Sequence, residues 1–119
     1  MWQGINRRKF PRVNYPCKIV VIKDSHKDKI ATQTENIGVG GVCVVINKPL
    51  NRYDDAGVIL YLGDGHQPVC CDGKVVWVVK KSASEYDTGI EFTALKDSDR
   101  LRIERVIQLC QKEQGFSTT

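Results

Sequence analysis

The feature that most constrains the fold is a regular alternation between short β-branched runs and clusters of turn residues. Runs rich in Val, Ile and Thr favour strands, because branched side chains pack well on a pleated surface. Gly, Pro, Asn and Asp gather between these runs and favour turns. The expected strands span residues 17–23, 30–35, 42–46, 58–62, 69–79 and 88–92. Short strands at this spacing predict an all-β domain, either a small antiparallel barrel or a sandwich.

The end of the chain follows a different pattern. Ile103, Val106, Ile107 and Cys110 fall at positions i, i+3, i+4 and i+7, which is the spacing of one helical face. The cluster Asp97-Ser98-Asp99 precedes them and contains residues that cap helix N-termini. We therefore expect a single C-terminal helix that covers one end of the β-structure.

The excess positive charge of the chain lies near its N-terminus. The net charge is +4, from 18 basic and 14 acidic residues. Residues 1–12 contain no acidic residue and four basic ones, Arg7, Arg8, Lys9 and Arg12. Elsewhere the two signs balance. This distribution predicts a local anion-binding site rather than a broad nucleic-acid-binding surface, so no nucleic-acid partner is expected.

Length and hydropathy bound the organisation of the chain. A chain of 119 residues can form one compact domain with one core. We expect a basic arm at residues 1–14, a barrel with its closing helix at 15–112, and a flexible tail at 113–119. No apolar run approaches the roughly 18 residues that span a membrane, and the first residues lack the apolar core of a signal peptide. These features predict a cytoplasmic protein without membrane contact.

The cysteines and the other reactive side chains give no sign of a metal site or of catalysis. The five cysteines are irregularly spaced, with no C-x-x-C pair and no histidine at a metal-ligand spacing. They are expected to be reduced thiols that serve as small apolar groups. The sequence shows no nucleophile–base pair and no paired-carboxylate motif. We therefore expect neither an enzyme nor a cofactor.

The first candidate binding motif is the segment from Arg8 to Arg12, which contains R-x-x-x-R. Pro11 disfavours helical geometry at Phe10, so the segment is extended or turned. In an extended chain Arg8 and Arg12 point to the same side. Two guanidinium groups so placed can hold phosphates bidentately or stack on flat bases. Taken alone, the segment also fits a solvated basic arm with Phe10 as its anchor in the core.

The second candidate motif is Asn36-Ile37-Gly38-Val39-Gly40-Gly41, which lies between two expected strands. Glycine permits a positive φ and a close approach of a ligand to the main chain. The amide of Asn36 can both donate and accept hydrogen bonds at the edge of a base. The structural alternative is a β-bulge or tight turn that helps the barrel close and binds nothing.

Taken together, the two motifs resemble the signature of the PilZ domain. In that family R-x-x-x-R is followed, some 20–30 residues later, by (D/N)-x-S-x-x-G. Arg8 and Arg12 match the first motif, and Asn36 and Gly41 match the second. Three later segments are similar to the family's last strands and its closing helix, namely residues 73–77, 88–92 and 97–109.

The resemblance implies a six-stranded antiparallel β-barrel with a C-terminal helix that binds cyclic di-GMP on its outer surface. Arginine suits this ligand because it can bind both phosphate and guanine bidentately and can stack on a base. Binding would change the conformation of the domain and signal to a protein partner, with motility, adhesion or exopolysaccharide production as the output. The expected ligand-binding residues are Arg7, Arg8, Arg12, Asn36, Gly38, Gly40, Gly41 and Trp77.

One departure from the family pattern affects the expected affinity. Gly38 stands where the family has serine, so a hydroxyl that would bond the ligand is missing. The loss of one neutral hydrogen bond costs about 0.5–1.5 kcal/mol, or up to about tenfold in affinity. Two alternatives therefore stay open: a PilZ-like interaction module that has lost nucleotide binding, and a barrel that binds nucleic acid. Against the second, no expected strand carries an aromatic–basic series.

Two residues carry further expectations. Arg7 precedes R-x-x-x-R, a position that in the family influences ligand stoichiometry, and it adds a third guanidinium next to Arg8 and Arg12. We expect two molecules of cyclic di-GMP per chain, bound as an intercalated pair. Trp77 is expected on the same strand face as Val75 and Val79, where its indole could stack on a guanine. Its structural alternative is a partly buried residue of the barrel.

Overall fold

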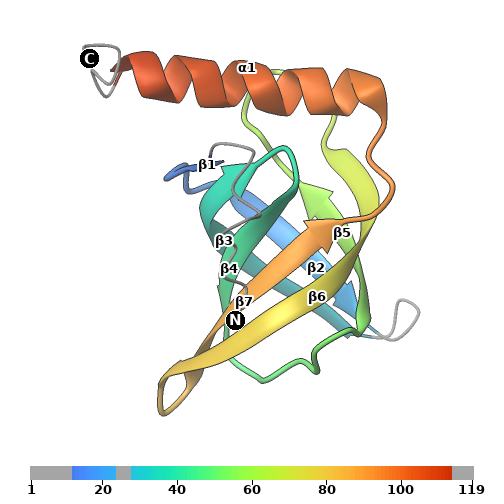
Figure 1. Cartoon of the computed structure of the whole chain (residues 1–119), viewed down its shortest axis with the longest axis vertical. Helices are drawn as coiled ribbons and strands as arrows, with labels where there is room; N and C mark the ends of the chain where they lie inside the picture. Colours follow the sequence, from blue (N-terminus) through green and yellow to red (C-terminus); the bar gives the residue numbers. More distant parts are fainter. Residues whose placement is uncertain (1–11, 24–27, 114–119) are drawn as a thin grey trace.

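In the computed structural model the described residues are 12–23 and 28–113 (Figure 1). They form seven strands and one helix. The elements are β1 (Arg12–Val13), β2 (Lys18–Lys23), β3 (Asp28–Gly38), β4 (Gly41–Ile46), β5 (Asp55–Leu60), β6 (Val69–Ser82), β7 (Glu85–Phe92) and α1 (Asp97–Glu113).

The strands form one antiparallel sheet that closes on itself. Its order is β1-β3-β2-β5-β6-β7-β4, and an additional pairing joins β3 to β4. That pairing closes β2 to β7 into a six-stranded barrel, while the short β1 pairs with the C-terminal end of β3. The predicted six-stranded antiparallel barrel with a C-terminal helix is therefore confirmed.

Alternation along the strands fills the barrel interior with branched apolar side chains. In β2, for example, Ile19 and Val21 are fully buried, whereas Lys18, the first residue of the strand, is exposed. Each strand contributes such residues, because successive side chains of a strand point to opposite faces. The interior positions then meet in one hydrophobic cluster that includes Val44, Leu60 and Ile90.

The helix α1 covers one end of the barrel (Figure 1). Its buried face consists of Ile103, Val106, Ile107 and Cys110, the four residues that the helical spacing had indicated. The helix contacts both β1 and β3. It begins at Asp97, so the predicted capping cluster forms the first turn, and the Lys96 carbonyl accepts the first helical hydrogen bond at 2.9 Å. Within the described ranges, no helix combines the length and the apolar character needed to cross a membrane.

Several strand boundaries differ from the sequence-based prediction, among them the end of β3 and the starts of β5 and β7. β3 continues to Gly38 instead of ending at residue 35, because β1 and β4 both pair with its last residues. β5 begins at Asp55, where an ion pair of 3.0 Å with Lys74 links it to β6. β7 begins at Glu85, since a two-residue turn joins it directly to β6. Local propensity did not indicate these ends because partner strands determine them.

All five cysteines lie in the described ranges, and each carries a free thiol. Cys43 and Cys110 are buried, as expected for small apolar groups. Cys70 is exposed, so the expectation of a buried role is wrong for that residue. It precedes Cys71 on β6, and adjacent residues of a strand face opposite sides.

Candidate functional site

Four residues from four adjacent strands form a continuous line across the barrel wall. Asn36 of β3 pairs with Cys43 of β4, Cys43 pairs with Gly89 of β7, and Gly89 pairs with Trp77 of β6. We call these four residues the outer row, because their chain neighbours Ile37, Val42, Val44 and Ile90 are the ones that point into the core. The outer row spans three strand spacings, or about 14 Å.

A β-bulge in β3 brings two consecutive side chains to the outside. The pairing with β4 shifts between Thr34 and Asn36, so Glu35 is the extra residue. Thr34 points inward, where its hydroxyl donates to the Tyr15 carbonyl at 2.6 Å. Asn36 faces outward, and the Glu35 carboxylate accepts from the Cys43 thiol on the same side at 3.2 Å. A β-bulge thus lies directly before this motif, and it presents Asn36 to the solvent side of the barrel.

A second bulge corrects the orientation predicted for Trp77. The pairing of β6 with β7 shifts between Val75 and Trp77. Val75 is fully buried in the core, so it does not share a face with Trp77, contrary to the prediction. The indole of Trp77 lies over Gly89, where an added Cβ would collide with the ring. Gly89 therefore leaves room for a flat, half-buried aromatic platform on the outer surface.

The N-terminal motif meets the outer row through β1. Arg12 pairs with Gly38 in the sheet, which places it next to the strand that carries Asn36. Burial and the Glu35 carboxylate raise the pKa of the Cys43 thiol, and the positive charge of Arg12 opposes that shift. Arg12 is thus close enough to Cys43 to act on it electrostatically. Arg7 and Arg8 lie outside the described residues.

The glycines of the second motif do not use the positive φ that glycine permits. Among the described residues, positive-φ glycines are Gly63 and Gly65, so Gly38, Gly40 and Gly41 use ordinary backbone conformations. A Cβ at Gly41 would collide with the Ile90 carbonyl oxygen, which shows a close approach of β4 to β7. The Gly40 carbonyl accepts a hydrogen bond from the Phe92 amide at 2.9 Å.

A polar network that the sequence did not reveal lies next to the outer row. The two carboxylate oxygens of Glu35 accept from Cys43 Sγ and from Lys81 Nζ, both at 3.2 Å. Burial opposes ionisation of Glu35, but these hydrogen bonds outweigh it and lower the pKa of that carboxyl. Burial and the neighbouring Glu35 carboxylate raise the pKa of Asp87. Only the cross-strand pairing brings these residues together, so no linear motif could have identified them.

Two oxygen atoms in this region are buried and lack a hydrogen-bond donor among the described residues. They are Oδ1 of Asn36 and Oδ1 of Asp87. Lys81 Nζ lies 4.0 Å from Asp87 Oδ1, within ion-pair range but beyond a hydrogen bond. Buried acceptors without donors are uncommon in folded proteins, so each one needs an explanation, such as a functional role or a bound water or ion. We call the outer row together with Glu35 and Asp87 the acceptor face.

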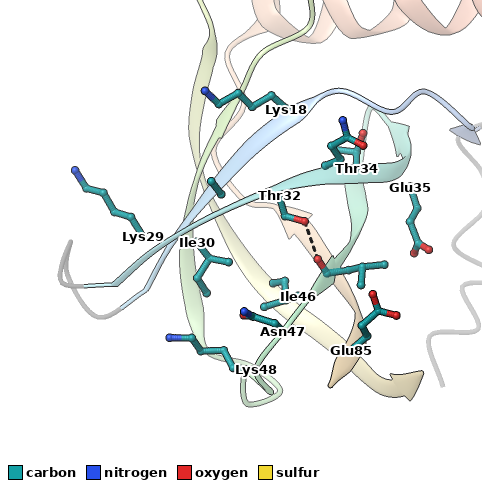
Figure 2. A pocket seen from close by; sticks show the side chains of 13 residues that line it. Lys18, Lys29, Ile30, Thr32, Thr34, Glu35, Ile46, Asn47, Lys48 and Glu85 are labelled. Atoms are coloured by element: carbon teal, nitrogen blue, oxygen red, sulfur yellow. Dashed lines mark hydrogen bonds between the residues drawn. The ribbon is translucent and has the colours of Figure 1, made fainter. Parts of the chain in front are cut away.

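A separate groove of about 930 Å³ lies where β3 and β4 diverge (Figure 2). The hydroxyl of Thr32 bridges the two strands by donating to the Val45 carbonyl at 2.8 Å. Lys29 and Lys48 extend on one side of this groove, and Glu35 and Glu85 on the other (Figure 2). None of the predicted site residues lines the groove, so it is distinct from the acceptor face apart from Glu35.

Comparison with solved structures shows the same fold in three proteins. The PilZ domain of YcgR from Escherichia coli, solved with c-di-GMP, has a TM-score of 0.73 at 12% identity, with 94% of this chain and 97% of that chain covered. MotI/DgrA, the inhibitor of motility from Bacillus subtilis, has 0.74 at 18%, covering 91% and 51%. Apo MrkH from K. pneumonia has 0.74 at 16%, covering 90% and 50%. The chain thus spans about half the length of MotI/DgrA and MrkH.

Comparison with sequences gives the family directly. No curated protein matches the chain. The family model described as PilZ domain matches residues 6–109, which include both motifs, all the strands and most of α1. The resemblance inferred from the two motifs is confirmed, and the chain belongs to the PilZ domain family.

Proposed function

We propose that this chain is a cyclic di-GMP receptor that binds the nucleotide on the acceptor face. One observation supports this most strongly: β1 and the outer row bring Arg12, Asn36 and Trp77 together on one outward surface. The first and the last of these residues, Arg12 and Trp77, are more than 60 positions apart in the sequence. Their chemistry is complementary to a ligand with two phosphates and two flat bases.

Each part of the ligand has a suitable protein group. The guanidinium groups of Arg8 and Arg12 would hold phosphate or the guanine O6 and N7 edge. The indole of Trp77 offers a stacking surface, and Asn36 offers a buried oxygen to a base donor. With Arg7 as a third guanidinium, the arm carries enough positive charge for an intercalated pair of ligands.

The relatives suggest the kind of output. YcgR was solved with c-di-GMP, MotI/DgrA is an inhibitor of motility, and another relative is the PilZ domain of CeSA from a cellulose-synthesising bacterium. We infer that this chain acts as a receptor or adaptor rather than as an enzyme, and that it signals to a protein partner in motility, adhesion or exopolysaccharide control. Its five free thiols fit a reducing cytoplasmic compartment.

Two observations bear on the remaining alternatives. MrkH is described as a c-di-GMP-dependent transcription regulatory factor, so the expectation of no nucleic-acid partner needs a direct test here. The second candidate function, an interaction module without nucleotide binding, is favoured by one observation, the glycine at position 38.

Calorimetric titration of the purified chain with cyclic di-GMP tests the proposal. We expect saturable binding that weakens as salt rises, because phosphate contacts are screened. GMP, cyclic di-AMP and a single-stranded oligonucleotide serve as competing ligands, and Arg105→Ala, an exposed arginine of α1, serves as the matched protein control. No heat with cyclic di-GMP would favour the interaction module, and tight binding of the oligonucleotide would favour a nucleic-acid function.

A further inference from the structure

The two carboxyl groups next to the outer row, those of Glu35 and Asp87, differ in how many of their oxygens accept a hydrogen bond. Both oxygens of Glu35 are engaged, by the Cys43 thiol and by the Lys81 ammonium group. Asp87 also contacts Glu35, and burial together with that close carboxylate raises the pKa of Asp87. Its Oδ1 is buried and has no hydrogen-bond donor within the described part of the chain. Lys81 Nζ lies 4.0 Å from this oxygen, which is an ion pair but not a hydrogen bond. Of the two carboxyl groups, Asp87 is therefore the one with an oxygen that can still accept a hydrogen bond.

The position of Asp87 relative to Trp77 defines what such a ligand can be. Asp87 lies two residues before Gly89 on β7, so both face the outside of the barrel. Trp77 covers Gly89 with its indole ring. The Oδ1 oxygen of Asp87 therefore lies at the border of an aromatic platform. A flat ring stacked on that platform would turn its polar edge toward acceptors, Asp87 Oδ1 on one strand and Asn36 Oδ1 on another.

The chemistry of these acceptors selects among nucleobases. Guanine carries two adjacent donors on its Watson–Crick edge, the N1–H group and the 2-amino group. Adenine has an acceptor at N1, which a carboxylate oxygen would repel. Hypoxanthine keeps N1–H but lacks the 2-amino group. A buried oxygen without a donor rejects a base that cannot supply one, since the oxygen then stays unpaired.

We propose that Asp87, positioned by Glu35 and Lys81, is a specificity residue that accepts hydrogen bonds from the Watson–Crick edge of a guanine stacked on Trp77. The assignment rests on the proposed nucleotide-binding function and adds a residue outside both sequence motifs. A guanidinium group offers a similar pair of parallel donors. The test must therefore distinguish a base from an arginine of the chain as the source of the donors.

The test compares two ligands on three proteins. Cyclic di-GMP and cyclic di-IMP, its hypoxanthine analogue, are titrated into the wild type, Asp87→Ala and Glu85→Ala. Glu85 is the matched control because it is an exposed carboxylate on the same strand and face, two residues before Asp87. We expect the wild type and Glu85→Ala to bind cyclic di-GMP about tenfold more tightly than cyclic di-IMP, the value of one good hydrogen bond. In Asp87→Ala this ratio should fall toward one.

The outcomes separate the two proposals. If the wild type binds neither ligand, the nucleotide-binding function itself is wrong. If it binds cyclic di-GMP but Asp87→Ala keeps the wild-type ratio, the function stands and the role of Asp87 is overturned. An arginine bound to Asp87 would give that second result, because both ligands would weaken equally. Should Asp87→Ala fail to fold, the carbon-13 signal of the Asp87 carboxyl in the wild type decides: it should move with cyclic di-GMP, and an unmoved signal overturns the contact.

Discussion

Two polar clusters of the domain differ in how completely their polar groups are hydrogen-bonded. At the start of α1, Arg102 binds Asp64 with two hydrogen bonds of 3.0 Å, Asp99 with one of 3.1 Å and the Gln67 carbonyl with one of 2.7 Å. We call this cluster the arginine anchor. On the acceptor face, by contrast, Asn36 and Asp87 each keep a buried oxygen without a donor from the described residues.

The difference teaches which polar cluster stabilises the fold and which is prepared for a ligand. The hydrogen bonds from Arg102 lower the pKa of Asp64, so the ionised carboxylate is favoured in the folded protein. Burial and the Glu35 carboxylate raise the pKa of Asp87, so the charged form is disfavoured there. The arginine anchor supports the native state, whereas the acceptor face costs stability that a bound donor would recover.

The largest expected effect concerns the arginine motif, which should act on binding and leave the fold unchanged. Arg12→Ala should weaken cyclic di-GMP binding by roughly 10- to 150-fold, because charge-assisted hydrogen bonds contribute about 1.5–3 kcal/mol each. Arg8→Ala should do the same. Backbone pairing of residue 12 with Gly38 survives the substitution, so the melting temperature without ligand should move little. Wild-type affinity in both variants, measured by calorimetry, would remove the arginines from the site.

The converse variant should act on stability and leave binding unchanged. Arg102→Met removes the anchor while keeping an apolar stem, and we expect a loss of about 2 kcal/mol in the free energy of unfolding at pH 7. Urea unfolding measures it, and unaltered affinity for cyclic di-GMP is the control. A stability loss accompanied by an equal loss of affinity would show that the two clusters are not independent.

The same variant carries a pH dependence whose sign follows from Asp64. The pKa of Asp64 is lowered in the folded state. The ionised carboxylate therefore adds to the free energy of unfolding above the unfolded-state pKa of about 3.9, and this stabilisation is lost as the pH falls through the lowered pKa. The stability difference between wild type and Arg102→Met should therefore be largest near neutral pH and shrink below pH of about 4. A difference that stays constant from pH 7 to 3 would contradict an electrostatic anchor.

A smaller effect is expected from restoring the family's serine. Gly38→Ser should tighten binding by up to about tenfold, the value of one hydrogen bond. Serine is tolerated only where the backbone does not need a positive φ, and Gly38 has an ordinary strand conformation that meets this condition. Weaker binding together with a lower melting temperature would mean that the buried position cannot accept a side chain, and the alignment of Gly38 with the serine would lose its force.

The smallest expected change is one of stoichiometry. Arg7→Leu should lower the number of cyclic di-GMP molecules per chain from two toward one, because a pair of ligands carries four phosphates and needs the extra guanidinium. Some binding should persist through Arg8 and Arg12. A calorimetric ratio near one for the wild type, unaltered in Arg7→Leu, would leave Arg7 as a solvated charge.

The sequence predicts the barrel, the helix and the family, but only part of the acceptor face. Alternation reveals which strand residues are apolar, and the spacing of Ile103, Val106 and Ile107 reveals the buried face of α1 correctly. It cannot reveal a bulge, because a bulge depends on the partner strand, and so the face of Trp77 was assigned wrongly relative to Val75. Glu35 and Asp87 were missed because they lie 52 positions apart in the sequence and share no motif, and only the pairing through β4 joins them. Arg7 and Arg8 stay predictions.

The two bulges make strand length, as much as residue identity, a requirement of this surface. Each adds one residue to one strand and leaves the partner unchanged. Deleting Glu35 would remove the bulge, so Thr34 and Asn36 would alternate regularly and Asn36 would stay outside, but the surface would lose the carboxylate that binds Cys43 and Lys81. A designer who transfers this surface to another barrel must therefore copy the extra residue of β3 and of β6, because a regular strand at either place presents one side chain fewer.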